Sequence, residues 1–177
     1  EERELTVNLA FEPQYDLVVD IQSSNVNSLA TIPSTLTFTS TNYATPQPIR
    51  VIGLQDINTV NENLQLSFTS PDADPTDVTV FLRDDDEQKL VVNPVSLIIP
   101  EGNSDVMTVR LAYQPEQSVT VGLNASSSGV LDLQPPNLVF TPADYDTPKQ
   151  VTITAIDDLN VTNDAHTLTV FAPTLTD

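Results

Sequence analysis

The sequence repeats itself at an offset of 102 residues, and this duplication restricts the chain to folds that can be built twice. Residues 1–75 align with residues 103–177 without a gap, and 20 of the 75 aligned pairs are identical. The identical pairs include Pro33, Leu36, Phe38, Tyr43, Pro46 and Asp56, which align with Pro135, Leu138, Phe140, Tyr145, Pro148 and Asp158. The chain is therefore expected to contain two copies of one module.

Residues 76–102 occur only once, and this indicates where each copy begins and ends. A complete module is therefore expected to start near Lys89. We expect one domain over residues 1–87 that lacks its first strand, and a second over residues 88–177 that lacks its last strand. The parent protein is expected to continue in both directions as an array, unless neighbouring subunits supply the missing strands.

Within each copy, apolar and polar residues alternate with a period of two. Residues 108–113, 119–123, 151–156 and 168–171 show the alternation, and clusters of Pro, Asn and Asp separate them. Val, Ile and Thr dominate these segments, and no stretch of ten residues combines helical periodicity with a cap. About seven short strands per roughly 100 residues are typical of an immunoglobulin-like sandwich. The sequence predicts an all-β protein made of two tandem immunoglobulin-like antiparallel β-sandwiches.

The charge balance bears on the partners of the chain. Six Lys and Arg residues stand against 25 Asp and Glu residues, which gives a net charge of −19 and argues against nucleic acid and anionic membranes as partners. No apolar run approaches the roughly 20 residues that span a bilayer, so we expect no membrane insertion. The chain has no Cys, and two sequons, at Asn124 and Asn160, are compatible with an extracellular protein.

The residues needed for enzyme chemistry are scarce. The chain has one histidine, His166, no Cys, and no nucleophile elbow or Gly-rich phosphate loop. We expect no enzyme activity, and we interpret His166 as a surface or half-buried residue at the start of a strand. Tyr43 and Tyr145 could serve as a carbohydrate platform, but the preferred interpretation is a loop aromatic folded onto each sandwich.

Acidic residues gather in the segments that follow the expected strands. The clusters are Asp84, Asp85, Asp86 and Glu87; Asp157, Asp158, Asn160, Asn163 and Asp164; Glu101 in a turn; and, in the first copy, Gln55, Asp56, Asn58, Asn61 and Glu62. Adjacent carboxylates repel one another, and a Ca²⁺ ion, which takes about 6 to 8 oxygen ligands, removes that repulsion and fixes the loop. The alternative is a solvated, flexible acidic hinge. The clustering favours Ca²⁺ as the cofactor.

Several short motifs occur in a characteristic order in the second copy. They are Pro100-Glu101-Gly102 after an apolar strand, Thr-Val-Arg-Leu at 108–111, Val-Thr-Val at 119–121, Leu138 with Phe140, and residues 151–158, which end in Ile-Asp-Asp. This order resembles the Calx-beta family, the immunoglobulin-like calcium-binding modules of sodium-calcium exchangers and many large bacterial surface proteins. The resemblance covers each copy from end to end.

The resemblance implies that acids from three strand ends meet around Ca²⁺ at one pole of each module. The metal ligands implied for the second copy are Glu101, Asp157 and Asp158, and those implied for the first copy are Asp56, Asp84, Asp85 and Asp86. The sequence departs from the family pattern at Gln55, where an Asp is expected. A further acid just beyond Asp-Asp is also missing, with Thr162 and Val60 near that place.

Together these features predict a non-catalytic extracellular repeat module with a structural or adhesive role, whose joints between repeats are stiffened by Ca²⁺. Its expected partners are adjacent repeats of the same protein or neighbouring subunits. One alternative is a module that binds a glycan or protein ligand, or that accompanies an enzyme domain in a larger secreted chain. Another is a filament subunit that donates a strand.

Overall fold

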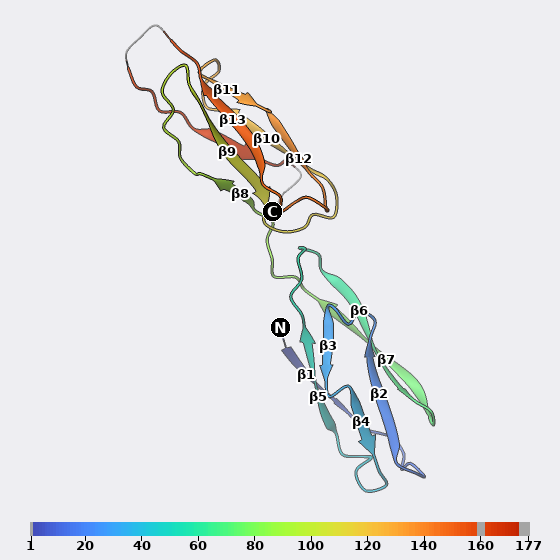
Figure 1. The fold of residues 1–177 in the computed structure, drawn as a ribbon. Coiled ribbons are helices and arrows are strands. Elements are labelled where there is room, and N and C mark those ends of the chain that lie inside the picture. The colour runs from blue at the N-terminus through green and yellow to red at the C-terminus, as the bar shows by residue number, and fades with distance from the viewer. Residues whose placement is uncertain (1, 159–161, 174–177) are drawn as a thin grey trace. The chain divides into compact units, whose positions relative to one another are not determined.

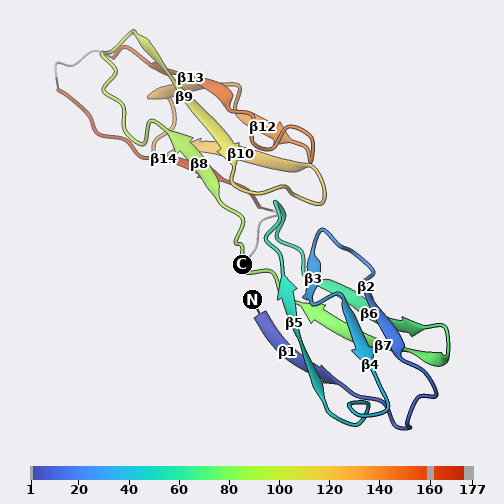
Figure 2. The same cartoon turned by 60° about the horizontal axis from the view of Figure 1, so that its bottom comes forward.

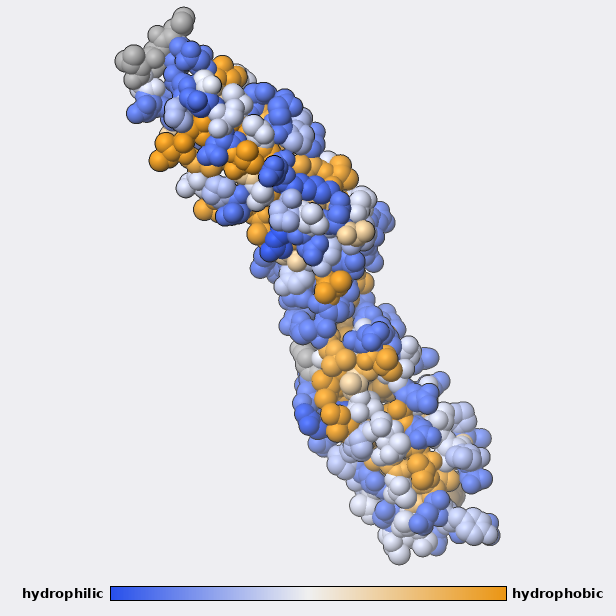
Figure 3. Space-filling model, in the orientation of Figure 1, coloured by the Kyte–Doolittle hydropathy of each residue, from blue (hydrophilic) through white to orange (hydrophobic). Residues whose placement is uncertain are grey.

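The computed structural model describes residues 2–158 and 162–173, and in these residues the chain is built from β-strands alone (Figure 1). They form 14 strands in four antiparallel sheets, without a helix. The all-β prediction is confirmed. The described residues accordingly offer no helix that could cross a membrane. The visible face is mostly hydrophilic and carries scattered apolar patches on both halves of the chain (Figure 3).

The chain divides into two compact units. Unit 1 comprises Glu1–Asp56 and Val60–Asp84, and unit 2 comprises Ile57–Thr59 and Asp85–Asp177. The main boundary thus lies between Asp84 and Asp85, whereas the repeat placed it between residues 87 and 88. The acidic run of residues 84–86 is therefore divided between the two units.

Unit 1 contains two sheets with seven strands in total. The strands are β1 (Glu2–Val7), β2 (Leu17–Ser23), β3 (Leu29–Ile32), β4 (Thr35–Phe38), β5 (Gln47–Gly53), β6 (Glu62–Ser70) and β7 (Ala73–Leu82). One sheet has the order β1-β5-β3 and the other has the order β4-β2-β6-β7. All of their pairings are antiparallel.

Unit 2 also contains two sheets with seven strands in its described residues. The strands are β8 (Leu90–Asn93), β9 (Ser104–Leu111), β10 (Val119–Ala125), β11 (Leu131–Gln134), β12 (Asn137–Phe140), β13 (Lys149–Ala155) and β14 (Leu168–Phe171). One sheet has the order β11-β13-β9-β8 and the other has the order β12-β10-β14. These pairings are antiparallel as well.

The strands of the two units follow the sequence offset. β2 and β10 span equivalent residues 102 positions apart, and so do β3 and β11, β4 and β12, and β5 and β13. β1 matches the first six residues of β9, and β14 lies within the segment equivalent to β6. Among the described residues, β8 has no counterpart in unit 1 and β7 has none in unit 2. The difference between the units is therefore one strand at one sheet edge in each case.

Each unit is a β-sandwich, because the two sheets of a unit share one apolar core. In unit 1 the core joins Leu29 and Ile49 of one sheet to Leu36, Phe38 and Leu66 of the other. The period-two pattern produces this arrangement, since alternate residues of a strand face opposite sides of its sheet. In β2, for example, the alternating pattern buries the first, third and fifth residues. Phe38, like its equivalent Phe140 in unit 2, is fully buried.

The two loop tyrosines pack against the cores. Tyr43 lies against the core of unit 1, and Tyr145 lies against the core of unit 2. Each residue also accepts a backbone hydrogen bond at its carbonyl, from Leu9 N (2.8 Å) and Leu111 N (2.9 Å) respectively. The interpretation of both tyrosines as loop aromatics folded onto the sandwich is confirmed. His166 is exposed, but it lies just before β14 and not in the strand as predicted.

Candidate metal centre

A tight turn over residues 100–103 positions Glu101. Asn103 N donates a hydrogen bond to the Pro100 carbonyl (3.0 Å), and the Asn103 side-chain amide donates to the Glu101 carbonyl (3.1 Å). Gly102 has a φ of 70°, a conformation that a residue with a Cβ rarely adopts. The Pro-Glu-Gly motif is therefore a turn whose backbone needs the glycine and whose tip carries the glutamate.

Backbone hydrogen bonds fix this turn to the end of β13. Gly102 N donates to the Ala155 carbonyl (3.0 Å), and Ala155 N donates to the Asn103 carbonyl (3.0 Å). Ala155 is the last residue of β13, and Asp157 and Asp158 follow it after one residue. Glu101 is thus held beside the acidic loop by main-chain contacts, without any side-chain contact being required.

The electrostatics of Glu101 show how closely the acids gather. Its pKa is raised above the ordinary value, mainly by the negative charge of Asp158, then by partial loss of hydration, and then by the charges of Asp157 and Asp164. Like charges disfavour ionisation, so this shift indicates that Glu101 lies within electrostatic range of Asp158, Asp157 and Asp164. The structure therefore places Glu101 near Asp157, Asp158 and Asp164.

In unit 1 the equivalent loop after β5 contains Asp56, and the acid that stands out there is Glu62, the first residue of β6. Glu62 Oε1 accepts a hydrogen bond from the side-chain amide of Asn25 (3.3 Å). The other carboxylate oxygen, Glu62 Oε2, is buried and has no hydrogen-bond partner among the described residues. Since buried polar atoms are nearly always satisfied, this oxygen is an acceptor without an explanation in the fold.

The remaining predicted ligands of the first copy are divided between the units. Asp56 and Asp84 belong to unit 1, and Asp85 and Asp86 belong to unit 2. Asp84 N donates to Asn61 Oδ1 (2.8 Å), so the end of unit 1 is fixed to the residue that precedes Glu62. Asp84 is thereby placed at the same end of the sandwich as Glu62.

The donor set suits a hard cation, although the side chains do not converge on one point. In residues 2–158 and 162–173, no three carboxylate or imidazole groups form a cluster that could hold a metal ion as they stand. The side chains of Glu101, Asp157, Asp158 and Asp164, which we call the acidic pole, nevertheless offer only oxygen ligands, and Ca²⁺ prefers these. Glu101, Asp157, Asp158 and Asp164 are exposed, so a change of rotamer can move each carboxylate.

The ligand set expected from the sequence did not include Glu62 and Asp164, although both residues belong to the acidic clusters. The two residues lie 102 positions apart and so occupy the same place in the two copies. Both copies have an acid at this position, although most aligned positions differ between the copies. This shared acid was the signal that could have identified the two residues. Asp164 and Glu62 lie two residues beyond Thr162 and Val60, near which the family pattern has a further acid.

Comparison with known proteins adds no further constraint. No family model matches the chain, and no curated protein matches it.

Proposed function

We propose that this chain is a non-catalytic module pair of an extracellular structural or adhesive protein, and that it binds Ca²⁺ at the acidic pole of its sandwiches. The observation that supports the proposal is the raised pKa of Glu101, caused first by Asp158 and further by Asp157 and Asp164. The order of motifs that resembles the Calx-beta family supports the same function. In such a protein the partners are further modules of the same kind.

The charge of the pole gives Ca²⁺ a reason to bind. Repulsion of Glu101 by Asp158, Asp157 and Asp164 raises the free energy of the folded state at neutral pH, and a divalent cation placed between these carboxylates removes that cost. Binding also costs side-chain entropy, because exposed Asp and Glu residues must adopt single rotamers. The fixed backbone of the 100–103 turn reduces this cost, since only side chains need to move.

The buried oxygen of Glu62 supports the same function for unit 1. A carboxylate oxygen that is withdrawn from water without a hydrogen bond is costly to the fold. A cation ligated by Glu62 Oε2 would satisfy it, and Asp56 and Asp84 are the members of the expected ligand set that belong to unit 1. Ca²⁺ at the module ends would then stiffen the joints between successive modules, which is the mechanical property an adhesive stalk needs.

The experiment is a Ca²⁺ titration by isothermal calorimetry, together with melting curves in Ca²⁺ and in chelator. A ligand that binds only the folded state stabilises it by about 2.7 kcal/mol when its concentration is a hundredfold above Kd. We expect the Tm to rise with millimolar Ca²⁺ and to return with chelator. Asp158→Asn and Glu101→Gln should each reduce the rise.

Two matched variants separate specific binding from general charge. Glu116→Gln removes the same single charge from an exposed loop outside the pole, and His166→Gln changes the only imidazole. Both should keep the full Ca²⁺ response. If calorimetry detects no heat of binding in millimolar Ca²⁺, or if Glu116→Gln lowers the response as much as Asp158→Asn does, the pole is a solvated acidic surface and the proposal is wrong.

A further inference from the structure

The sheet β12-β10-β14 of unit 2 contains a sequence motif that the proposed function does not use. Asn124, Ala125 and Ser126 form the triplet Asn-X-Ser, which is the acceptor motif for N-linked glycans. Asn124 lies in β10, the central strand of this sheet, and Ser126 follows the last residue of that strand (Figure 2). The other such triplet, at Asn160, lies outside the described residues.

The side chain of Asn124 lies on the outer face of this sheet. Alternate residues of a strand face opposite sides, so Asn124 shares its face with Gly122, whereas Val121 is buried in the core. Asn124 is exposed to solvent. The equivalent Gln22 in unit 1 is exposed as well, although the sheet has four strands there and three in unit 2. Exposure at this position therefore does not depend on the number of strands in the sheet.

An aromatic ring lies beside this asparagine. Gly122 pairs with Phe171 of β14 and Asn124 pairs with Thr169, so Phe171 and Asn124 are diagonal neighbours on one face of the sheet. The Phe171 ring covers Gly122, where a Cβ would lie 2.6 Å from the tip of the ring. The ring is therefore directed across the sheet, over the position two residues before Asn124. It is 43% exposed, so part of its surface is accessible to a group attached to this face.

We propose that Asn124 carries an N-linked glycan and that the ring of Phe171 packs against its first sugar. This inference rests on the extracellular location in the proposed function, because N-glycans are added to secreted proteins. In the transfer, the amide nitrogen of Asn124 forms a bond to C1 of an oligosaccharide that is donated by a lipid diphosphate. The C1–O bond to the diphosphate breaks, the diphosphate leaves with the bonding electrons, and the amide nitrogen loses one proton.

The folded sheet leaves room for the sugar but holds the motif in place. Ser126 N donates a hydrogen bond to the Thr167 carbonyl (2.9 Å), and Thr167 N donates to Ser126 Oγ (3.1 Å). Because these bonds fix the end of β10 to the segment before β14, transfer to Asn124 takes place before the sheet forms. The folded state then needs only an exposed asparagine side chain, which it has.

The Phe171 ring suits N-acetylglucosamine, the first sugar of such a glycan. One face of this sugar presents C–H groups, and an aromatic ring offers both apolar surface and an electron-rich face. Contact between the two removes exposed apolar surface of Phe171 from water. Unit 1 has Gln22 in place of Asn124 and Thr69 in place of Phe171, so the acceptor and the ring occur together in the same copy.

The first experiment is secretion of the full 177-residue chain, behind a cleavable signal peptide, from mammalian cells that keep their glycans in the high-mannose form. Peptide mass spectrometry measures the occupancy of Asn124 and Asn160 separately. We expect a glycan at Asn124 in most molecules, its loss in Ser126→Ala, and its retention in Ser126→Thr, which keeps the motif. Secreted, folded protein with an unmodified Asn124 overturns the proposal. The Ca²⁺ titrations use unglycosylated protein, so the two proposals can fail independently of each other.

The second experiment tests the contact with Phe171. An endoglycosidase trims the glycan to one N-acetylglucosamine, and the Tm of this protein is compared with that of Asn124→Gln. We expect the single sugar to raise the Tm of unit 2 by about 2 to 4 °C, and Phe171→Thr should abolish most of this rise. The matched control is Gln22→Asn, which creates an Asn-Ser-Ser triplet in unit 1, where a sugar should leave the Tm unchanged. An equal rise with and without the Phe171 ring overturns its assignment.

Discussion

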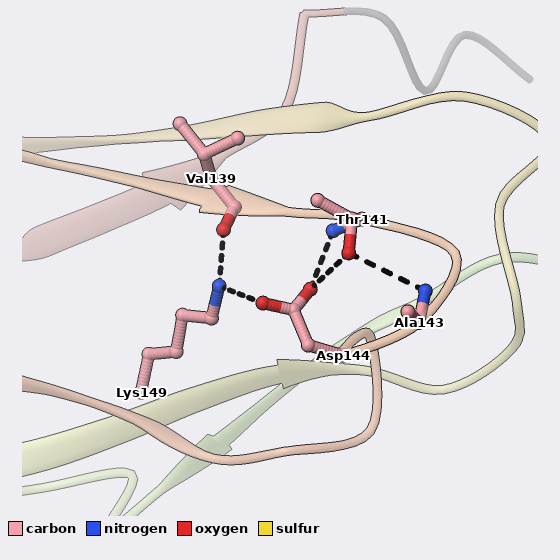
Figure 4. Close-up of polar contacts among 5 residues, drawn as sticks. All are labelled: Val139, Thr141, Ala143, Asp144 and Lys149. Atoms are coloured by element: carbon pink, nitrogen blue, oxygen red, sulfur yellow. Dashed lines mark hydrogen bonds and ion pairs between the residues drawn. The ribbon is translucent and has the colours of Figure 1, made fainter.

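Lys149 Nζ lies 2.6 Å from Asp144 Oδ2 in unit 2, and this ion pair closes the corner between β12 and β13 (Figure 4). Asp144 Oδ1 accepts two further hydrogen bonds, from Thr141 N (2.6 Å) and Thr141 Oγ1 (2.8 Å). Lys149 Nζ also donates to the Val139 carbonyl and lies 4.7 Å from the centre of the Phe140 ring. One carboxylate and one ammonium group thus link the corner to the most buried aromatic residue of the unit.

The first prediction concerns acid stability. Hydrogen bonds from Lys149 and from Thr141 lower the pKa of Asp144 from its ordinary value of 3.8 to about 2. Because the folded state holds the ionised form, Asp144 contributes stability above the unfolded pKa, and this contribution is lost as the pH falls from about 4 toward 2. Asp144→Asn should flatten the decline in this window. Urea unfolding at a series of pH values measures it, and parallel curves for both proteins would contradict the assignment.

The equivalent corner of unit 1 provides a matched exchange. Asn42 Oδ1 accepts from Thr39 N (2.6 Å) and Gln47 Nε2 donates to the Thr37 carbonyl (2.9 Å), so an uncharged pair occupies the same geometry. Asp144→Asn or Lys149→Gln alone should lower the Tm, because each leaves a charge without its partner. The double variant recreates the pair of unit 1, and its loss should be smaller than the sum of the single losses. Strict additivity would show that the two side chains are not coupled.

Glu101 should behave in the opposite sense from Asp144. Its pKa is raised, so its ionised form destabilises the folded state. The protonated carboxyl of Glu101 therefore contributes stability below the unfolded pKa of about 4.3, and this contribution is lost as the pH rises through the folded pKa. In chelator, Glu101→Gln should therefore raise the Tm at pH 7 and have little effect at acid pH. Melting curves at both pH values test this, with Glu116→Gln as the control. A Tm that falls at pH 7 would contradict the like-charge interpretation.

Gly122 in β10 pairs with Phe171 of β14, and the Phe171 ring covers its backbone. A Cβ at position 122 would lie 2.6 Å from the tip of the ring, which must then move away. Gly122→Ala should destabilise unit 2 by about 1 kcal/mol through loss of this cross-strand contact. In the Phe171→Thr background, which copies the Asp20 and Thr69 pair of unit 1, the same substitution should cost less. An equal cost in both backgrounds would show that the ring plays no part.

The two copies also predict a difference in the cost of cavities. Leu111→Ala should destabilise unit 2 by about 2 to 5 kcal/mol, because the side chain is fully buried. The equivalent Leu9→Ala should cost less, because Leu9 is only half-buried. Chemical denaturation that resolves the two units measures both losses.

The alternation of apolar residues was enough to predict the strands, because a strand with one buried face places alternate residues in the core. The duplication predicted the equivalent positions of those strands. The approach of Glu101 to Asp157 and Asp158 depends on backbone hydrogen bonds that join Gly102 and Asn103 to Ala155, which no residue pattern encodes. The buried oxygen of Glu62 was missed because burial of a single atom depends on neighbours such as Asn25, distant in sequence.

The ladder between β8 and β9 contains only four residue pairs and lies at the edge of its sheet. Short edge strands detach from a folded domain at lower free energy than central strands do. A detached β8 leaves β9 without its partner on that side, and the strand can return to its own chain or to that of a second molecule. The protein concentration during storage or expression therefore determines whether β8 pairs within its own chain or with a second molecule.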